Sequence, residues 1–198
     1  MNRLNIEREL LEGAIIREPV GDEKGYWVGA PGWCWDKPDQ AAYLTYRIRR
    51  PRGVEPDRGG ESRIARTTDF KSFEDVWSVR KSQYDSASIE KSTLKRGPDG
   101  QWRYFTSYVA PEDGRWCTTV NRADTVEALD PGNTKRLFTA TELGLEGVKD
   151  PWLMEVDGVY YLFLSVAKST STTGDKSHDS LDIFNTGECV SATALATS

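Results

Sequence analysis

The chain has 198 residues with a formal net charge of −5, and 37% of its residues are hydrophobic. The negative charge argues against a nucleic-acid-binding surface, which needs a basic patch. No apolar run approaches the roughly 18 residues of a membrane-spanning helix, so we expect neither nucleic acid nor a membrane as a partner.

The first 25 residues form a charged N-terminal extension, in which Leu and Ile over residues 3–16 give a short helical pattern. The extension lacks the apolar core and small-residue cleavage site of a secretory signal, so we expect a cytoplasmic protein. Three widely spaced cysteines, Cys34, Cys117 and Cys189, form no CxxC pair. We therefore expect free thiols, with no metal site and no other cofactor.

A repeated unit follows the extension. Each copy is a short strand, a turn rich in Gly, Pro or Asp, and a second strand rich in Tyr, Phe and β-branched residues. The first strands are expected at residues 28–36, 89–95 and 148–156, and the second strands at residues 42–47, 102–108 and 159–164. Third strands are expected at residues 61–68, 116–120 and 191–197, and fourth strands at residues 76–82 and 135–139.

The spacing of the copies indicates the architecture. Tyr43, Tyr104 and Tyr161 anchor the second strands and are 61 and 57 residues apart, a period that holds four strands with their loops. A blade of a β-propeller has that content. We therefore predict an all-β fold, a partial β-propeller over residues 26–198, with blades at about 26–85, 86–145 and 146–198.

A propeller closes by pairing its last blade with its first, and a stack of about three blades leaves apolar faces open. We therefore expect either a longer parent chain or self-association through the open blade faces. The polar stretch 165–182, which contains the single histidine, His178, is expected to form a long surface loop.

The first strand of each blade lines the central channel of a propeller, so equivalent positions converge on one axis. Aligned on their turns, the copies place Ala30, Glu90 and Asp150 at equivalent positions, to within two residues for the middle copy. Two carboxylates facing one pocket are the minimum equipment for acid–base cleavage of a glycosidic bond. The alternative is that both carboxylates bind neighbouring backbone N–H groups and have only a structural role.

The segment around Asp150 carries a more specific pattern, VKDP at residues 148–151 followed by DGVYYL at residues 157–162. It resembles the Asp-Pro and Asp-Gly-x-Tyr-Tyr-Leu pattern of the five-bladed β-propeller glycoside hydrolases of families 43 and 32. The resemblance covers residues 26–198 and implies that Asp150 orients the catalytic acid and tunes its pKa. It also implies a catalytic base where Ala30 stands, with Asp36 the nearest carboxylate, and a general acid on a blade beyond Ser198.

Other residues suit a carbohydrate partner. Trp33, Trp35 and Trp152 offer flat faces on which a sugar stacks, and Arg47 offers hydrogen bonds to hydroxyls or a uronate. Packing or solvated surface roles are the alternative for each of them.

The leading hypothesis is a glycoside hydrolase that uses Asp150, Glu90 and Asp36. One rival is a non-catalytic carbohydrate-binding or scaffold propeller, favoured by Ala30. Another is a protein-interaction propeller that uses its rim.

Overall fold

The computed structural model describes residues 13–170 and 183–198. The helical pattern expected at residues 3–16 therefore lies mostly outside the described residues, as does His178, and residues 13–16 are not helical. No helix in the described part of the chain is long and apolar enough to cross a membrane.

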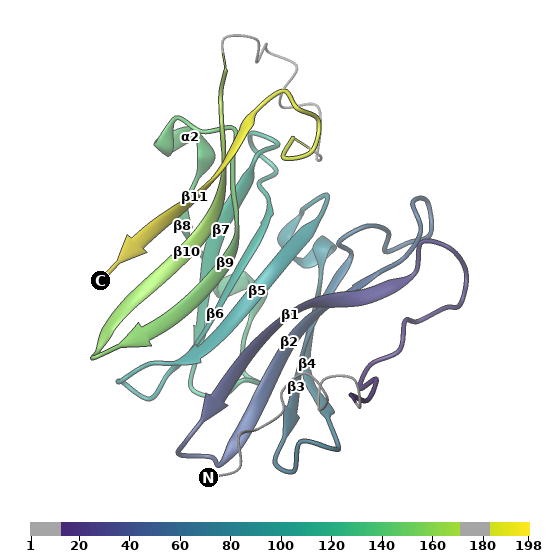
Figure 1. Ribbon diagram of the computed structural model, residues 1–198, viewed down its shortest axis with the longest axis vertical. Coiled ribbons are helices and arrows are strands. Elements are labelled where there is room, and N and C mark those ends of the chain that lie inside the picture. Colours follow the sequence, from purple (N-terminus) through teal and green to yellow (C-terminus); the bar gives the residue numbers. More distant parts are fainter. Residues whose placement is uncertain (1–12, 171–182) are drawn as a thin grey trace.

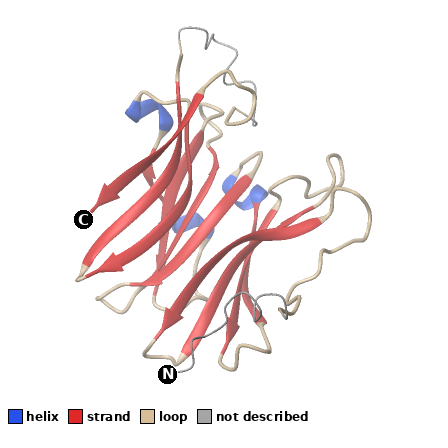
Figure 2. Cartoon of the chain, viewed as in Figure 1, coloured by secondary structure: helices blue, strands red, loops and turns tan. Residues whose placement is uncertain are grey.

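The described chain is nearly all β, in agreement with the predicted fold class (Figure 2). The first blade is an antiparallel sheet in chain order, made of β1 (Trp27–Asp36), β2 (Ala41–Arg49), β3 (Glu61–Thr67) and β4 (Glu74–Arg80). The second blade contains β5 (Ile89–Arg96), β6 (Trp102–Val109), β7 (Trp116–Ala123) and β8 (Lys135–Phe138). The third contains β9 (Gly147–Val156), β10 (Val159–Lys168) and β11 (Val190–Thr197).

Each strand expected from the repeat is present. The short helical segments η1 (Lys81–Tyr84), η2 (Pro131–Asn133) and α2 (Ala140–Leu143) were not expected. The start of the loop expected at residues 165–182 was wrong, because β10 continues to Lys168 in pairing with β11. Residues 171–182 of that loop lie outside the described residues. The exact blade boundaries stay a prediction.

The inner strands of the blades lie side by side, with β5 between β1 and β9 (Figure 1). A single parallel pair, Trp116 with Gly147, joins β7 to β9, so the second and third blades share one hydrogen-bonded sheet. Gly32 shows how closely the first two blades approach. A Cβ there would lie 2.6 Å from the carbonyl oxygen of Ser92, to which Thr45 donates a hydrogen bond of 2.9 Å.

The core lies between the blades. Leu94, Trp102 and Tyr104 of the second blade are buried with Cys34 of the first. Full burial of an apolar side chain of this size stabilises a fold by roughly 1.5–3 kcal/mol. Burial also raises the pKa of Cys34 to about 11, as it raises that of Cys117 to about 12. Both buried cysteines are free thiols, as expected from the sequence.

One face of the third blade carries an apolar row across three strands. Trp152, Phe163 and Leu195 are direct cross-strand neighbours, and Trp152 and Leu195 are 47% and 52% exposed. Self-association through open blade faces, which would cover such a row, stays a prediction.

Candidate functional site

Each inner strand is bulged at the same place. The regular pairing with the next strand is interrupted at residues 30–31 in β1, at residues 90–91 in β5 and at residues 150–151 in β9. Bulges re-aim side chains and are common next to active sites. Ala30, Glu90 and Asp150 each come first in their bulge, so the three positions are equivalent in the sheet.

The bulges in β1 and β9 also share a backbone shape. Ala30 has a φ of 53° and Asp150 a φ of 57°, and each precedes a proline. The left-handed region is costly for residues with a Cβ, and Asp and Asn enter it more readily than Ala does. The backbone at residue 30 is therefore one that an aspartate would adopt more easily than the alanine that stands there.

Glu90 and Asp150 are brought together by Lys149. Its Nζ lies 3.8 Å from Glu90 Oε1 and 3.7 Å from Asp150 Oδ2. Because both oxygens are this close to one nitrogen, they are at most about 7.5 Å apart, which is near enough for two carboxylates to act on one bond.

Arg47 completes the cluster from the neighbouring blade. Its Nη1 donates to Glu90 Oε2, and its guanidinium lies 5.3 Å from the ring centroid of Trp27. Burial lowers the pKa of Arg47, and the negative charges of Glu90 and Asp150 oppose that shift. Two cations and two carboxylates therefore alternate at the junction of β2, β5 and β9.

A hollow of about 430 Å³ opens beside Asp150. Its lining combines hydroxyls, an amide and one aromatic ring, from Ser165, Phe184, Asn185, Ser191 and Thr193. The ring centroid of Phe184 lies 4.6 Å from Lys149 Nζ. Hydrogen-bonding groups around an aromatic face are suited to a polyhydroxylated ligand.

Most residues of this hollow were not predicted from the sequence. Lys149 stands inside the VKDP pattern and was visible there. Phe184 and Asn185 precede β11 in a segment with no periodicity, and only the folded chain brings them to Asp150.

Asp36 does not join the cluster, contrary to its proposed role as the base. It stands six residues after Ala30 on an extended strand, which corresponds to about 20 Å. Its Oδ2 accepts a hydrogen bond of 3.0 Å from the N–H of Asp39 and lies 3.5 Å from Arg96 Nη1. The buried carboxylate of Asp36 therefore anchors the turn between β1 and β2.

The three tryptophans expected to bind sugar also lie apart from Glu90. Trp33 and Trp35 alternate along β1 with the buried Cys34, so they point away from the second blade. Both have ring centroids 5.8 Å from that of Phe70. Trp152 lies 5.5 Å from Phe163 on the apolar row of the third blade. Of the predicted ligand-binding residues, only Arg47 contacts a predicted catalytic carboxylate.

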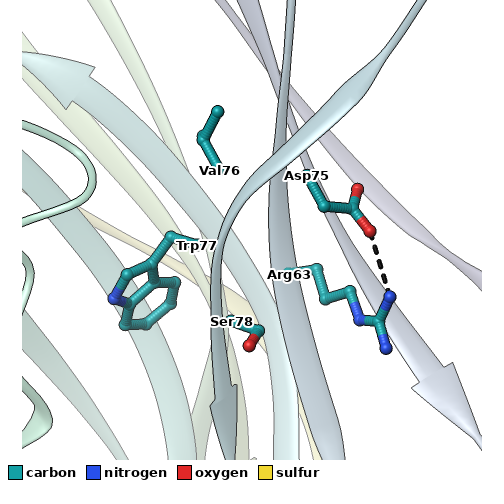
Figure 3. Close-up of a pocket in the computed structure, with 5 residues that line it drawn as sticks. All are labelled: Arg63, Asp75, Val76, Trp77 and Ser78. Carbon is teal, nitrogen blue, oxygen red and sulfur yellow. Dashed lines mark hydrogen bonds and ion pairs between the residues drawn. The ribbon is translucent and has the colours of Figure 1, made fainter.

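Another hollow lies on the edge of the first blade, where a bulge at Val76 interrupts the pairing of β3 with β4. Figure 3 shows its ion pair, Arg63 Nη1 to Asp75 Oδ2 at 3.0 Å. Tyr46 and Arg17 donate to the other oxygen of Asp75, at 2.7 and 2.8 Å. Asp75 thus ties the N-terminal extension to the blade, and its acceptors are occupied by the protein itself.

This carboxylate should make the stability depend on acid pH. Burial alone would raise the pKa of Asp75, but hydrogen bonds from Tyr46, Arg17 and Arg63 outweigh it and hold that pKa below its ordinary value. The stabilisation is therefore complete above the unfolded pKa of about 3.9 and is lost as the pH falls through the lower folded pKa.

We expect Asp75→Asn to lower the free energy of unfolding at pH 7 by about 1 kcal/mol and to shrink the stability difference between pH 7 and pH 3. Urea denaturation at both values measures this, with Asp22→Asn in the exposed extension as the control. An unchanged pH dependence in Asp75→Asn would contradict the assignment.

Within residues 13–170 and 183–198, no group of three or more His, Cys, Asp or Glu side chains is arranged to hold a metal ion.

Comparison with known proteins agrees with this architecture. A glycoside hydrolase of family GH43_12 from a capybara gut metagenome superposes with a TM-score of 0.54 at 16% identity, covering 91% of this chain and 30% of that one. The chain has the fold of the five-bladed β-propeller glycoside hydrolases. A Bacillus subtilis levansucrase superposes with a TM-score of 0.52 at 11% identity, covering 85% of this chain and 50% of that one.

An endo-arabinase of Bacteroides thetaiotaomicron gives a TM-score of 0.50 at 16% identity, with 78% of this chain and 49% of that one covered. The chain thus spans half or less of the length of these three structures. No family model and no curated protein matches the sequence. At these identities the likeness establishes the propeller fold, and the function has to be argued from the site.

Proposed function

We propose that the chain binds a carbohydrate in the hollow beside Asp150 and hydrolyses a glycosidic bond with Asp150 and Glu90. The observation that supports this most is the pair of carboxylates bridged by Lys149, which come from equivalent bulges of adjacent blades. The glycosidase fold is consistent with hydrolysis of a glycosidic bond, but a fold does not by itself assign an activity.

The two carboxylates differ in their surroundings. Both oxygens of Glu90 face cations, Arg47 on one side and Lys149 on the other, and this pairing suits an electrostatic role in the reaction. Asp150 lines the hollow and is partly exposed, with Lys149 as its cation. We assign Asp150 the contact with substrate and the proton transfer, and Glu90 the negative charge that supports a positively charged transition state or activates water.

The test is to measure binding and cleavage separately. Structural neighbours are named as a β-xylosidase, an endo-arabinase and a β-1,3-galactosidase, so an aryl β-xyloside, arabinan and β-1,3-galactan form the first panel. We expect one of them to bind and to release reducing sugar. A panel member that binds without cleavage would reject hydrolysis and leave carbohydrate binding. Absence of binding throughout the panel would count against both.

Carbohydrate binding without hydrolysis is the second candidate, and one observation favours it. Ala30 offers a methyl group at the position equivalent to Asp150, where the resemblance to glycoside hydrolases implies the base. The bulge in β1 could hold a third carboxylate near Glu90 and Asp150, but it carries an alanine.

Ala30→Asp should therefore raise the hydrolysis rate by about tenfold or more, because general acid–base groups contribute about 100- to 10,000-fold when well placed. Ala30→Asn is the matched control, since Asn enters the left-handed region as readily but carries no charge. The rate of sugar release by both variants and the parent chain measures the effect. Equal rates for the Asp and Asn variants would show that residue 30 lies outside the reacting centre.

A further inference from the structure

A second cavity, of about 410 Å³, lies between the second and third blades. Its walls come from β6, β7 and β8 on one side and from β9, β10 and β11 on the other. It shares no lining residue with the hollow beside Asp150. Substitutions in this cavity can therefore be tested without changing the hollow beside Asp150.

The interior of the cavity is apolar. Phe105 and Val120 are cross-strand neighbours on β6 and β7, and Leu153 and Leu162 face them from the third blade. Leu137 of β8 lies at the cavity with 39% of its surface exposed. A volume of this size with apolar walls is typical of a small-molecule site.

The next cross-strand pair on the same face is cationic. Arg103 and Arg122 lie directly opposite each other and both line the cavity, although like charges in that position destabilise a sheet. Arg103 is neutralised by Asp99, to which it donates at 2.8 and 2.7 Å. Arg122 is exposed, and in the described part of the chain no hydrogen bond or ion pair engages it.

The cavity therefore combines an apolar interior with a positive charge at its edge. Besides the two arginines, the polar lining residues are Tyr160, Thr197 and Ser198. A neutral sugar would therefore bury most of its hydroxyls against apolar walls, which is costly. A purely apolar ligand would make no ion pair with Arg122. A ligand with an anionic group on an apolar chain would pair with Arg122 and also pack against the apolar walls.

We propose that this cavity binds an amphipathic monoanion, a medium-chain carboxylate, with its carboxylate at Arg122 and its chain against Phe105 and Leu162. Arginine binds carboxylates through two parallel N–H donors, which fixes the orientation of the ligand. Each further CH₂ buried against the interior should tighten binding by up to about fourfold until the cavity is full.

The test is a calorimetric titration of the 198-residue chain with octanoate, repeated with hexanoate and with 1-octanol as the neutral match. Octanoate should bind in a one-to-one ratio, more tightly than hexanoate and about tenfold more tightly than 1-octanol. Arg122→Gln should weaken octanoate binding about tenfold and leave 1-octanol unchanged. Lys37→Gln, which removes an exposed cation from the turn between β1 and β2, is the charge-matched control and should bind like the parent chain.

A second variant tests the location independently of charge. Ala196 lines the cavity from β11, and Ala196→Trp should fill it and reduce octanoate affinity at least about tenfold while Arg122 remains. Absence of octanoate binding would overturn the proposal. So would equal affinity for 1-octanol, or unchanged binding by Arg122→Gln or Ala196→Trp.

The same titration at several protein concentrations separates a ligand site from an interface. Octanoate affinity that falls as the protein concentration rises would assign the cavity to a second copy of the chain and would also overturn the proposal. Since Asp150 lies outside this cavity, failure of the sugar panel would leave these results unaffected.

Discussion

Asp150→Asn should reduce glycoside hydrolysis at least about 100-fold, the smallest loss typical of a removed acid–base group. The substitution takes away the charge and the transferable proton of the one carboxylate that lines the hollow. It keeps the side-chain shape, and Asn tolerates the φ of 57° at this position. The fold should therefore survive, and kcat/KM on whichever panel member is cleaved measures the loss directly.

Asp157→Asn is the matched control for that experiment. Asp157 also has a positive φ, 52°, but it is exposed in the hairpin turn between β9 and β10. Its rate should equal that of the parent chain. If Asp150→Asn keeps the parent rate, or if both variants lose activity with a lower melting temperature, Asp150 would have no direct part in the reaction.

Asp150→Asn should reduce the affinity for sugar less than it reduces kcat. The amide that Asp150→Asn introduces keeps hydrogen-bonding capacity toward hydroxyls, and the other polar groups of the hollow are unchanged. A large loss of kcat with a small change in binding is the signature of an interaction made mainly in the transition state. A parallel loss of both would mean that Asp150 contributes mainly to holding the sugar and not to the transition state.

Strand positions were predictable because they depend on local signals. Alternating aromatic and β-branched residues and the Asp157-Gly158 turn specify strands and hairpins without reference to distant parts of the chain. The repeat then supplied the blade architecture, and with it the pairing of Glu90 with Asp150. These positions followed from the sequence because equivalent strands must converge on one axis.

What the sequence could not supply depends on contacts between blades. The bulges at Glu90 and Asp150 are defined by the hydrogen bonds of neighbouring strands, which no local pattern encodes. By contrast, the distance of Asp36 from Ala30 follows from the extended strand alone, which carries Asp36 to the turn before β2. The aromatic content suggested sugar binding. In the structure Trp35 stacks on Phe70 and Trp33 lies tilted against the same ring, away from the carboxylates.

The ion pair between Arg47 and Glu90 should be strongly coupled in stability. Glu90→Gln removes the carboxylate that faces Arg47, whose side chain is only 7% exposed, and leaves a buried positive charge without its main partner. Loss of one member of a buried pair costs about 3–5 kcal/mol, and we expect about 3 here because Glu90 is 18% exposed. Arg47→Met should be less costly, since Lys149 still faces Glu90.

The double variant Arg47→Met with Glu90→Gln shows whether the two side chains stabilise each other or whether each substitution lowers the stability independently. Replacing both charges removes the desolvation penalty together with the attraction, so the double variant should be more stable than Glu90→Gln alone. Urea denaturation of the four proteins in the cycle gives the coupling free energy, and Glu112→Gln, which breaks an exposed ion pair with Arg136, should change stability little. Additive losses would mean that the two side chains do not support each other. Coupling would mean that the charge on Glu90, which the proposed reaction requires, is held in place by Arg47 from the adjacent blade.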